Sequence, residues 1–335
     1  MSGALRAAVI GVGRMGCHHA RLYHEMPSAE LVAVVDIDAE KAARVAAEHQ
    51  CRAFTRLSDV IDRIDVASVA VPTVYHEEVA TPLIDRGVAV LIEKPMAPDG
   101  AAARRMLDRA DQRGVPIQVG HSERFNPVVV TLQRMEVSPQ FIEAHRISPF
   151  TFRSADIGVV FDMMIHDIDI VLHLVRDRDY RVSAVGVAVL GAHEDIANAR
   201  VEFSNGAVAN LTASRLALKT ERKIRVFCSD AYLSMDYGKK SGIAIKKDAN
   251  LDLLKMARER DFTDLSQMQN VDFGSMVNVE PLVIDDVEPL RAEISAFLSA
   301  VGEGTPPPVS GADGLAAVEM AEAVVNAVQA HGWKT

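Results

Sequence analysis

The sequence is poor in cysteine. It contains Cys17, Cys51 and Cys228, an odd number of widely spaced residues without a CxxC pair. A disulfide framework or a structural zinc site needs clustered cysteines, so neither is expected. We expect a folded protein of a reducing, cytoplasmic setting. Its 335 residues, 49% of them hydrophobic, are enough for about two domains with a sizeable core.

Basic residues are too few to balance the acidic ones. Lys and Arg number 36 against 46 Asp and Glu, which leaves a formal net charge of -10. Such a chain repels phosphate backbones and anionic lipid, so we expect neither nucleic acid nor a membrane as a partner. An anionic small molecule is still compatible with this charge, because a pocket needs only a few well-placed cations.

Long hydrophobic runs are missing as well. The longest apolar stretch, around residues 184–192, is interrupted by glycine and is too short to span a bilayer. The amino-terminal residues lack a charged segment followed by an apolar block and a cleavage site. We therefore expect no export signal and no membrane span.

The chain does contain, up to residue 121, an alternation of strand and helix patterns. Helical stretches separate the apolar runs, and one of them, residues 77–86, contains Pro82, for which we expect a kink or a helix start delayed to Thr81. The alternation predicts a parallel, doubly wound sheet in a domain spanning residues 1–121. The expected strands are residues 5–10, 31–35, 66–71, 88–92 and 117–119.

A second domain is predicted for residues 122–335. A helix is expected at 162–175, and short alternating runs follow it, with a hairpin turn at Asn205-Gly206. Residues 247–275 are polar and are expected to form a loop. This pattern predicts a mainly antiparallel sheet with few helices. The expected strands are 182–190, 197–203, 207–214, 224–228, 232–236 and 243–245, and the closing helices are 289–301 and 314–328.

A glycine-rich turn follows the first strand. Gly11, Gly13 and Gly16 form a GxGxxG pattern that opens a helix. The first glycine allows a tight turn, the second lets the backbone approach a pyrophosphate, and the third lets the helix pack on the strand. Because the pattern stands between a strand and a helix, it predicts a dinucleotide-binding site.

An acidic residue follows the second strand. Asp36 comes twenty residues after Gly16. A carboxylate there accepts hydrogen bonds from both ribose hydroxyls and repels a 2'-phosphate, which favours NAD over NADP. Arg44 or Arg56 could weaken that preference.

Two segments carry groups that can handle a proton. Glu93-Lys94-Pro95 directly follows the strand 88–92, at the sheet edge where open α/β folds bind ligands. A solvated lysine is the alternative. Asp162 and His166 are four residues apart and therefore share one helix face.

Asp169 and His173 extend the face of Asp162 and His166 along the helix. Two carboxylates and two imidazoles in one stripe make a divalent metal site conceivable. Open metal sites, however, need ligands that converge from more than one direction, so no metal is predicted.

These motifs together resemble the Gfo/Idh/MocA oxidoreductases. The resemblance spans nearly the whole chain and rests on the glycine-rich turn, on Pro72-Thr73 with His76, on Glu93-Lys94-Pro95 and on the Asp162-x-x-x-His166 pair. It implies α/β plus α+β architecture: a Rossmann domain, then an open-faced, mainly antiparallel sheet. It also implies dimers or tetramers built through that sheet.

The resemblance further implies the roles of the site residues. Oxidation of a carbinol requires the hydroxyl proton to leave with the hydride, so a base is needed. Either His166 or Lys94 serves as that base, and Asp162 holds the imidazole or a substrate hydroxyl. The expected NAD contacts are Gly11, Gly13, Arg14, Met15, Gly16, Asp36, Pro72, Thr73, His76, Glu93 and Lys94.

Residues 120–127, 166–170 and 288–293 are similar to a branch of the family that contains UDP-N-acetylglucosamine 3-dehydrogenases. The branch implies a 3-keto sugar nucleotide for a partner aminotransferase, leading to a 3-amino sugar of the lipid A type. Arg124 and Asn126 could then grip the sugar or its phosphates, or form a domain-junction salt bridge and a helix cap. An inositol or free-sugar dehydrogenase is the alternative, and a non-catalytic NAD sensor is the least favoured.

Overall fold

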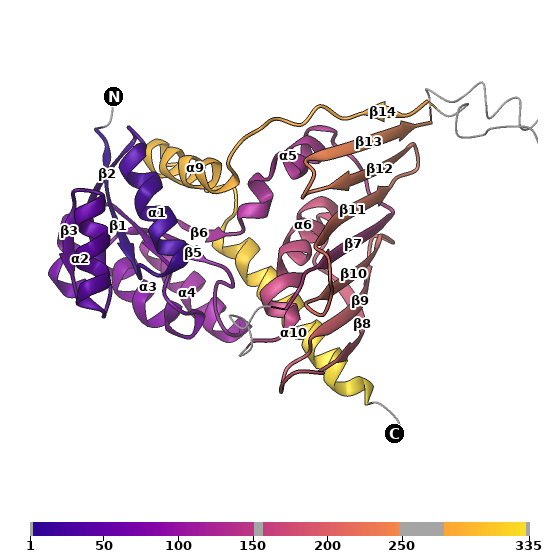
Figure 1. The fold of residues 1–335 in the computed structure, drawn as a ribbon, viewed down its shortest axis with the longest axis horizontal. Coiled ribbons are helices and arrows are strands. Elements are labelled where there is room, and N and C mark those ends of the chain that lie inside the picture. The colour runs from indigo at the N-terminus through magenta and orange to yellow at the C-terminus, as the bar shows by residue number, and fades with distance from the viewer. Residues whose placement is uncertain (1–2, 151–156, 248–277, 333–335) are drawn as a thin grey trace, which may run out of the picture.

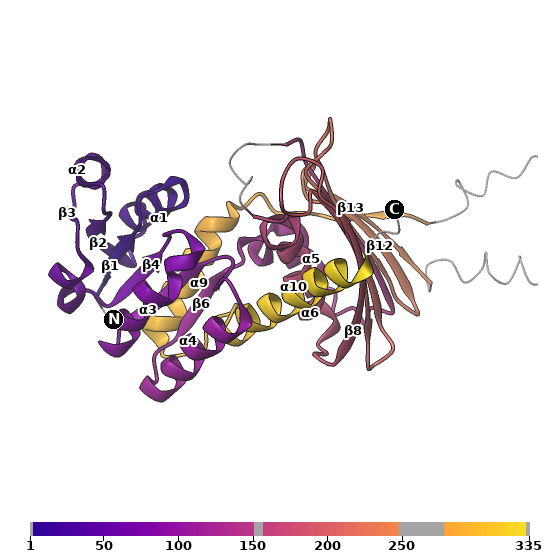
Figure 2. The same cartoon turned by 90° about the horizontal axis from the view of Figure 1, so that it is seen from below.

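The computed structural model describes residues 3–150, 157–247 and 278–332. Two sheets stand side by side, with helices between and around them (Figure 1). The long helix α10 (Gly311–His331) runs from the first sheet to the second (Figure 2). Within the described residues, no helix is long and apolar enough to cross a membrane.

In the described part of the chain, the first sheet has six parallel strands. Their order, β3-β2-β1-β4-β5-β6, reverses direction between β1 and β4, and open α/β sheets bind ligands at the carboxyl ends beside such a reversal. The predicted doubly wound sheet is thus confirmed. The strands are β1 (Leu5–Ile10), β2 (Ala29–Val35), β3 (Arg52–Phe54), β4 (Val66–Val69), β5 (Ala89–Glu93) and β6 (Ile117–Gly120).

The helices of this unit begin and end as their sequences direct. The Asp38 side chain accepts hydrogen bonds from two backbone amides at the start of α2, and the Asp99 side chain accepts one at the start of α4. Gly114, at φ +64°, ends α4 in the left-handed conformation. The helices are α1 (Arg14–Glu25), α2 (Ala39–Glu48), α3 (His76–Asp85) and α4 (Gly100–Arg113).

Pro82 lies inside α3, which begins at His76. The expected delay of the helix start to Thr81 is therefore wrong. Proline has no backbone N–H group and so removes one hydrogen-bond donor from the helix. Its carbonyl oxygen still accepts a hydrogen bond from the Arg86 amide. The Thr81 hydroxyl also donates to the Glu77 carbonyl at 2.7 Å, one turn earlier.

The second sheet has eight strands in the described residues, in the order β14-β13-β12-β11-β7-β10-β9-β8. Their pairing is antiparallel except between β7 and β10, which run parallel. The turn at Asn205-Gly206 joins β9 to β10, with Gly206 at φ +90°, as predicted. The strands are β7 (Phe141–Ile147), β8 (Tyr180–Val187), β9 (Ile196–Phe203), β10 (Val208–Ser214), β11 (Glu221–Phe227), β12 (Ala231–Asp236), β13 (Ser241–Lys246) and β14 (Glu280–Pro281).

The helices α5 (Pro127–Arg134), α6 (Ile165–Val175) and α10 all lie on one face of this second sheet (Figure 2). The side chains of β9 alternate between exposed and buried, as a sheet covered on one face requires. The opposite face carries no helix among the described residues. The expected loop at 247–275 lies outside the described residues, apart from Lys247.

The last part of the chain ties the two sheets together. Helix α9 (Pro289–Glu303) packs on α1, where Phe297 and Ile294 are buried against Leu22 and Tyr23. Full burial of a side chain such as Phe297 stabilises the fold by about 1.5–3 kcal/mol. The division into domains 1–121 and 122–335 stays a prediction, and α9 is a carboxyl-terminal element that packs on the first unit.

Candidate active site

The glycine-rich turn has the shape that a dinucleotide needs. Gly11 has φ +88°, and a Cβ there would lie 2.8 Å from the backbone after β4. A Cβ on Gly16 would lie 1.8 Å from the carbonyl oxygen of Gly11. A Cβ on Gly13, in contrast, would have no described atom within 4 Å. Gly13 therefore opens a space at the amino terminus of α1, where the backbone can approach a pyrophosphate.

Asp36 lies at the carboxyl end of β2, beside this turn. Its Oδ2 accepts a hydrogen bond from the Val12 amide at 2.9 Å, and its Oδ1 accepts one from the Asp38 amide at 2.9 Å. Each carboxylate oxygen can accept a further bond, so the pair remains able to receive ribose hydroxyls. The Arg56 side chain is bonded to Asp59. The residues present thus fit NAD.

The turn after β4 is held in place by a histidine. Pro72 precedes a 3₁₀ turn (Thr73–Tyr75), and His76 follows it. The His76 ring lies 3.1 Å (Nδ1) from the carbonyl oxygen of Met96 and 2.9 Å (Nε2) from that of Val71. Burial lowers the pKa of His76. Its imidazole therefore joins the turns after β4 and β5, while Pro72 and Thr73 lie at the same edge.

Glu93 ends β5, and hydrogen-bond partners within the protein hold its carboxylate in place. Its Oε1 lies 2.8 Å from His19 Nε2, and its Oε2 accepts a hydrogen bond from the Lys94 amide at 3.2 Å. His19 Nδ1 in turn lies 2.8 Å from the Ser68 hydroxyl. Burial would raise the pKa of Glu93, but the bond to His19 and the charges of His19 and Lys94 outweigh burial and lower it. Glu93 is accordingly an anion. The peptide bond from Lys94 to Pro95 is cis.

Lys94 is directed into the site and is not a solvated surface lysine. Its Nζ donates to the backbone carbonyl of Asp162 at 2.7 Å and lies 3.6 Å from Asp162 Oδ1. The Lys94 side chain is 19% exposed. Burial lowers its pKa, while Asp162 and Glu93 partly offset that effect. The structure thus brings Lys94 and Asp162 together from the two units.

His166 lies one turn beyond Asp162. The helix begins earlier than predicted, because a π-helical segment (Val160–Met164) runs directly into α6. Burial, followed by the charges of Lys94 and Arg146, holds the pKa of His166 well below its ordinary value. Its Nδ1 is buried and has no hydrogen-bond partner among the described residues. The imidazole is therefore uncharged at neutral pH and is able to accept a proton.

Arg124 and Asn126 have partners within the protein. Arg124 makes a bidentate ion pair with Asp169, at 2.7 and 2.8 Å, and its Nη1 lies 2.7 Å from His173 Nδ1. Asn126 caps α5 and donates to Glu123 at 3.0 Å. These are the junction salt bridge and the cap of the alternative interpretation. The stripe formed by Asp169 and His173 is likewise engaged by Arg124.

Two arginines of the second sheet belong to the site and were missed from the sequence. Arg146, on β7, is buried and makes a bidentate pair with Asp167, both bonds at 2.9 Å. Arg222, on β11, shares its face with the buried Ile224, so it points toward the helices. Its side chain is 48% exposed, and its Nη1 lies 3.8 Å from Glu123. The sequence feature that could have revealed them is a basic residue at an inward-facing position of a strand whose side chains alternate between the two faces of the sheet.

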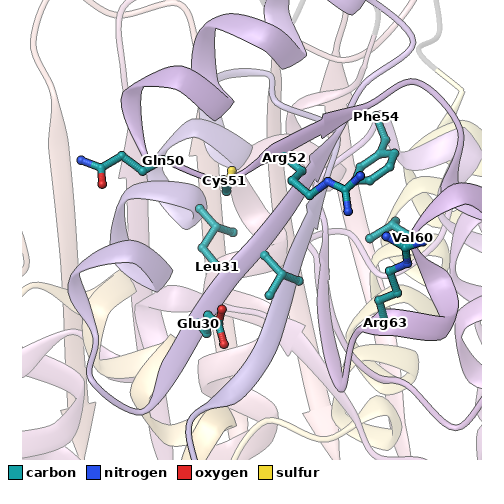
Figure 3. A pocket seen from close by; sticks show the side chains of 9 residues that line it. Glu30, Leu31, Gln50, Cys51, Arg52, Phe54, Val60 and Arg63 are labelled. Atoms are coloured by element: carbon teal, nitrogen blue, oxygen red, sulfur yellow. The ribbon is translucent and has the colours of Figure 1, made fainter.

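Two open pockets among the described residues lie away from Lys94 and His166. One, of about 410 Å³, lies between β2 and β3 and is lined by Glu30, Arg52, Phe54 and Arg63 among others (Figure 3). Another, of about 500 Å³, lies between the end of α5 and the β12–β13 edge of the second sheet. Neither touches Lys94 or His166, so the site is defined here by its side chains.

Comparison with known proteins agrees with this geometry. Residues 5–121 match the oxidoreductase family with an NAD-binding Rossmann fold, and residues 131–234 match the Gfo/Idh/MocA carboxyl-terminal domain. A UDP-N-acetylglucosamine 3-dehydrogenase from Acidithiobacillus ferrooxidans is 39% identical over 234 residues, which is 70% of this chain and 74% of that protein. An inositol 2-dehydrogenase from Corynebacterium glutamicum is 31% identical over 190 residues, 53% of this chain and 56% of that protein.

A solved structure of the same Acidithiobacillus ferrooxidans enzyme covers almost the whole chain. It superimposes with a TM-score of 0.86 at 33% identity, over 98% of this chain and 99% of that one. The likeness includes both units and not only the dinucleotide-binding half. The chain belongs to the Gfo/Idh/MocA family and is an oxidoreductase with an NAD-binding Rossmann domain.

Proposed function

We propose that the protein oxidises a secondary hydroxyl of a sugar nucleotide, and that this hydroxyl is the one at C3 of UDP-N-acetylglucosamine. The main support for this chemistry is the arrangement of three residues. Lys94 contacts Asp162, and an uncharged His166 lies one helical turn after Asp162. The relative of that name supports the substrate, since it matches this chain over nearly its full length. Inositol 2-dehydrogenases, one 31% identical over about half of this chain and another 23% identical over 97% of it, leave free polyols as the second candidate.

The protein residues divide the proton chemistry between them. Bound NAD supplies the acceptor for the hydride. His166 takes the hydroxyl proton as the carbinol carbon becomes a carbonyl, because its imidazole is uncharged. Lys94 donates a hydrogen bond to the oxygen on which charge develops, and Asp162 holds the ammonium group. In the alternative assignment, Lys94 is the base, which its lowered pKa permits.

Arg222 is the residue we assign to the charged part of a nucleotide. Arg124 and Arg146 are buried and already bonded to carboxylates, whereas half of the Arg222 side chain is exposed. Its charge is also among those that lower the pKa of His166, which supports a role for Arg222 near the reacting centre. A guanidinium at this position suits a diphosphate, with which it forms paired hydrogen bonds.

A substrate panel tests the proposed function. NADH formation is measured with NAD and UDP-N-acetylglucosamine, beside free N-acetylglucosamine and myo-inositol, with a carbonyl trap to draw the reaction forward. We expect turnover with the nucleotide sugar alone. Turnover of myo-inositol with none of the nucleotide sugar would agree with the family assignment but would contradict the proposed substrate.

We further propose that the chain forms a homo-oligomer, a dimer or a tetramer, through the second sheet. The face opposite α6 and α10 carries no described helix, and the side chains that β9 directs to it are exposed. Sedimentation analysis that finds only monomers would contradict the oligomer.

The setting and the partner of the enzyme are proposals as well. The three cysteines are free thiols, which suits the cytoplasm. A 3-keto sugar nucleotide would pass to an aminotransferase, on the route to a 3-amino sugar for lipid A.

A further inference from the structure

A group of buried polar atoms without partners lies behind the catalytic residues. Glu293, on α9, is 0% exposed, and neither of its carboxyl oxygens has a hydrogen-bond partner among the described residues. The same holds for Gln118 Oε1 and for both ring nitrogens of His121. Buried polar atoms are nearly always bonded, so a group of them in one place is an unusual feature.

The position of Glu293 is fixed by its backbone. Gln118, on β6, donates from Nε2 to the carbonyl oxygen of Glu293 at 3.0 Å. This bond holds α9 against the strand next to β5, the strand that ends at Glu93. The Glu293 backbone is therefore held beside β6, one strand away from the strand that leads to Lys94.

The charged groups that face Glu293 are of the wrong sign to hold a carboxylate. Glu93 and Asp169 are the carboxylates that act on it, from β5 and α6 respectively. Each of them already has a partner: Glu93 is bonded to His19 and Asp169 to Arg124. Tyr23, which faces it from α1, is uncharged and bonded to the Ser68 hydroxyl.

His121 is a further titratable group near this cluster, since the charges of Asp169 and Glu93 both act on it. Burial lowers its pKa, so it does not supply a positive charge to Glu293. A buried carboxylate with no cation beside it is very costly in free energy, and the group takes up a proton instead.

We propose that Glu293 is a positioning residue that stands in the folded enzyme as an uncharged carboxylic acid and leaves Glu93 as the single anion behind Lys94. Burial, together with the charges of Glu93 and Asp169, raises the pKa of Glu293 well above its ordinary value. The inference relies on Lys94 belonging to the reacting centre, as proposed above, but it does not depend on the identity of the substrate.

The consequence for the reaction concerns the charge state of Lys94. Its pKa is lowered by burial and raised by Asp162 and by Glu93. A second carboxylate behind Glu93 would raise it further and favour the fully protonated ammonium group. The proton on Glu293 thus removes a charge that would otherwise raise the pKa of Lys94.

An infrared difference spectrum tests the charge state directly and needs no substrate. The spectrum of Glu293→Gln is subtracted from that of the wild type at neutral pH. We expect the carbonyl stretch of a protonated carboxyl group to be present in the wild type and lost in the variant. Glu303→Gln, an exposed position on the same helix, is the control and should remove no such band. Loss of only carboxylate bands in Glu293→Gln would overturn the proposal.

The pH dependence of stability gives an independent readout. A raised pKa in the folded state means that the wild type loses stability as pH rises above the ordinary range of glutamate, about 4.3. Glutamine does not titrate, so the melting temperature of Glu293→Gln minus that of the wild type should increase from pH 5 to pH 8. A difference that stays constant or decreases would contradict the uncharged acid.

Kinetics separate a positioning role from a merely structural one. Glu293→Gln keeps an uncharged hydrogen-bonding group and should retain the wild-type kcat. Glu293→Leu is uncharged as well, and because neither carboxyl oxygen of Glu293 has a partner among the described residues, this variant too should leave kcat and the KM for NAD nearly unchanged if it folds. A shift of the pH profile of kcat to lower pH in Glu293→Gln would mean that the wild type carries a charge at this position and would contradict the role. If the leucine variant does not fold, the glutamine variant and the infrared spectrum decide the matter.

Discussion

At the scale of single residues, the account depends on Lys94 and His166 acting on the proton and not on the cofactor. Replacing either by alanine should lower kcat by about 10²–10⁴-fold, the usual contribution of a positioned acid or base. The affinity for NADH, followed by its fluorescence, should be nearly unchanged. Lys239→Ala, at an exposed turn, is the control. Equal losses of cofactor affinity and of activity would instead assign both residues to cofactor binding.

The charge of Lys94 also has a measurable effect on its neighbour. Because this cation lowers the pKa of His166, the variant Lys94→Met should raise that pKa toward the ordinary value of about 6.5. An NMR titration of the histidine ring protons measures it, with His166→Gln used to assign the signal. An unchanged pKa in Lys94→Met would mean that the two groups do not face one another.

Arg222 tests the nucleotide part of the substrate. Arg222→Gln should raise the KM for UDP-N-acetylglucosamine by about tenfold or more and leave kcat largely unaffected, since it removes binding and not chemistry. Arg63→Gln, an exposed residue of the first unit far from the site, is the control. A fall in kcat at constant KM would move Arg222 from the phosphate site to the reacting centre.

At the scale of elements, variants in the glycine-rich turn distinguish effects on protein stability from effects on NAD affinity. A Cβ at Gly13 would enter open space, and φ there is -68°, which alanine adopts freely. Gly13→Ala should therefore keep the wild-type melting temperature and lose NAD affinity, because the methyl group occupies the pyrophosphate position. Isothermal calorimetry and thermal melts measure the two quantities.

Gly16→Ala is the matched comparison for this element. Its Cβ would meet the Gly11 carbonyl at 1.8 Å, so the backbone must shift, and stability should fall by about 1–3 kcal/mol together with NAD affinity. If Gly13→Ala destabilised the protein as much as Gly16→Ala does, the open space above Gly13 would not be a ligand site.

Most elements were predictable because their patterns are local. Five of the six described strands of the first sheet and the turn at Asn205-Gly206 follow from apolar runs and from turn chemistry, whereas the three-residue β3 was not predicted. β7 was missed because its inward positions include Arg146, a cation where an apolar residue is expected. The π-helical start of α6 was missed because periodicity does not distinguish it from an ordinary first turn.

At the scale of the whole molecule, the remaining parts of the site could not be read from the sequence. The residues that hold one another, such as Arg124 with Asp169 or Gln118 with Glu293, come from elements that meet only after folding. Helix α9 is an example, since it lies near the end of the chain and yet packs on α1. The motifs locate the reacting groups, whereas the surrounding charges become visible only in the assembled fold.

The central claim is that hydride leaves C3 of a nucleotide sugar. UDP-N-acetylglucosamine that carries deuterium at C3 is incubated with NAD and the enzyme, and the reduced cofactor is analysed by mass spectrometry. The account predicts one deuterium in each NADH formed, together with slower turnover from a primary isotope effect. Unlabelled NADH formed from the C3-deuterated sugar would place the oxidation at another carbon and would contradict the account.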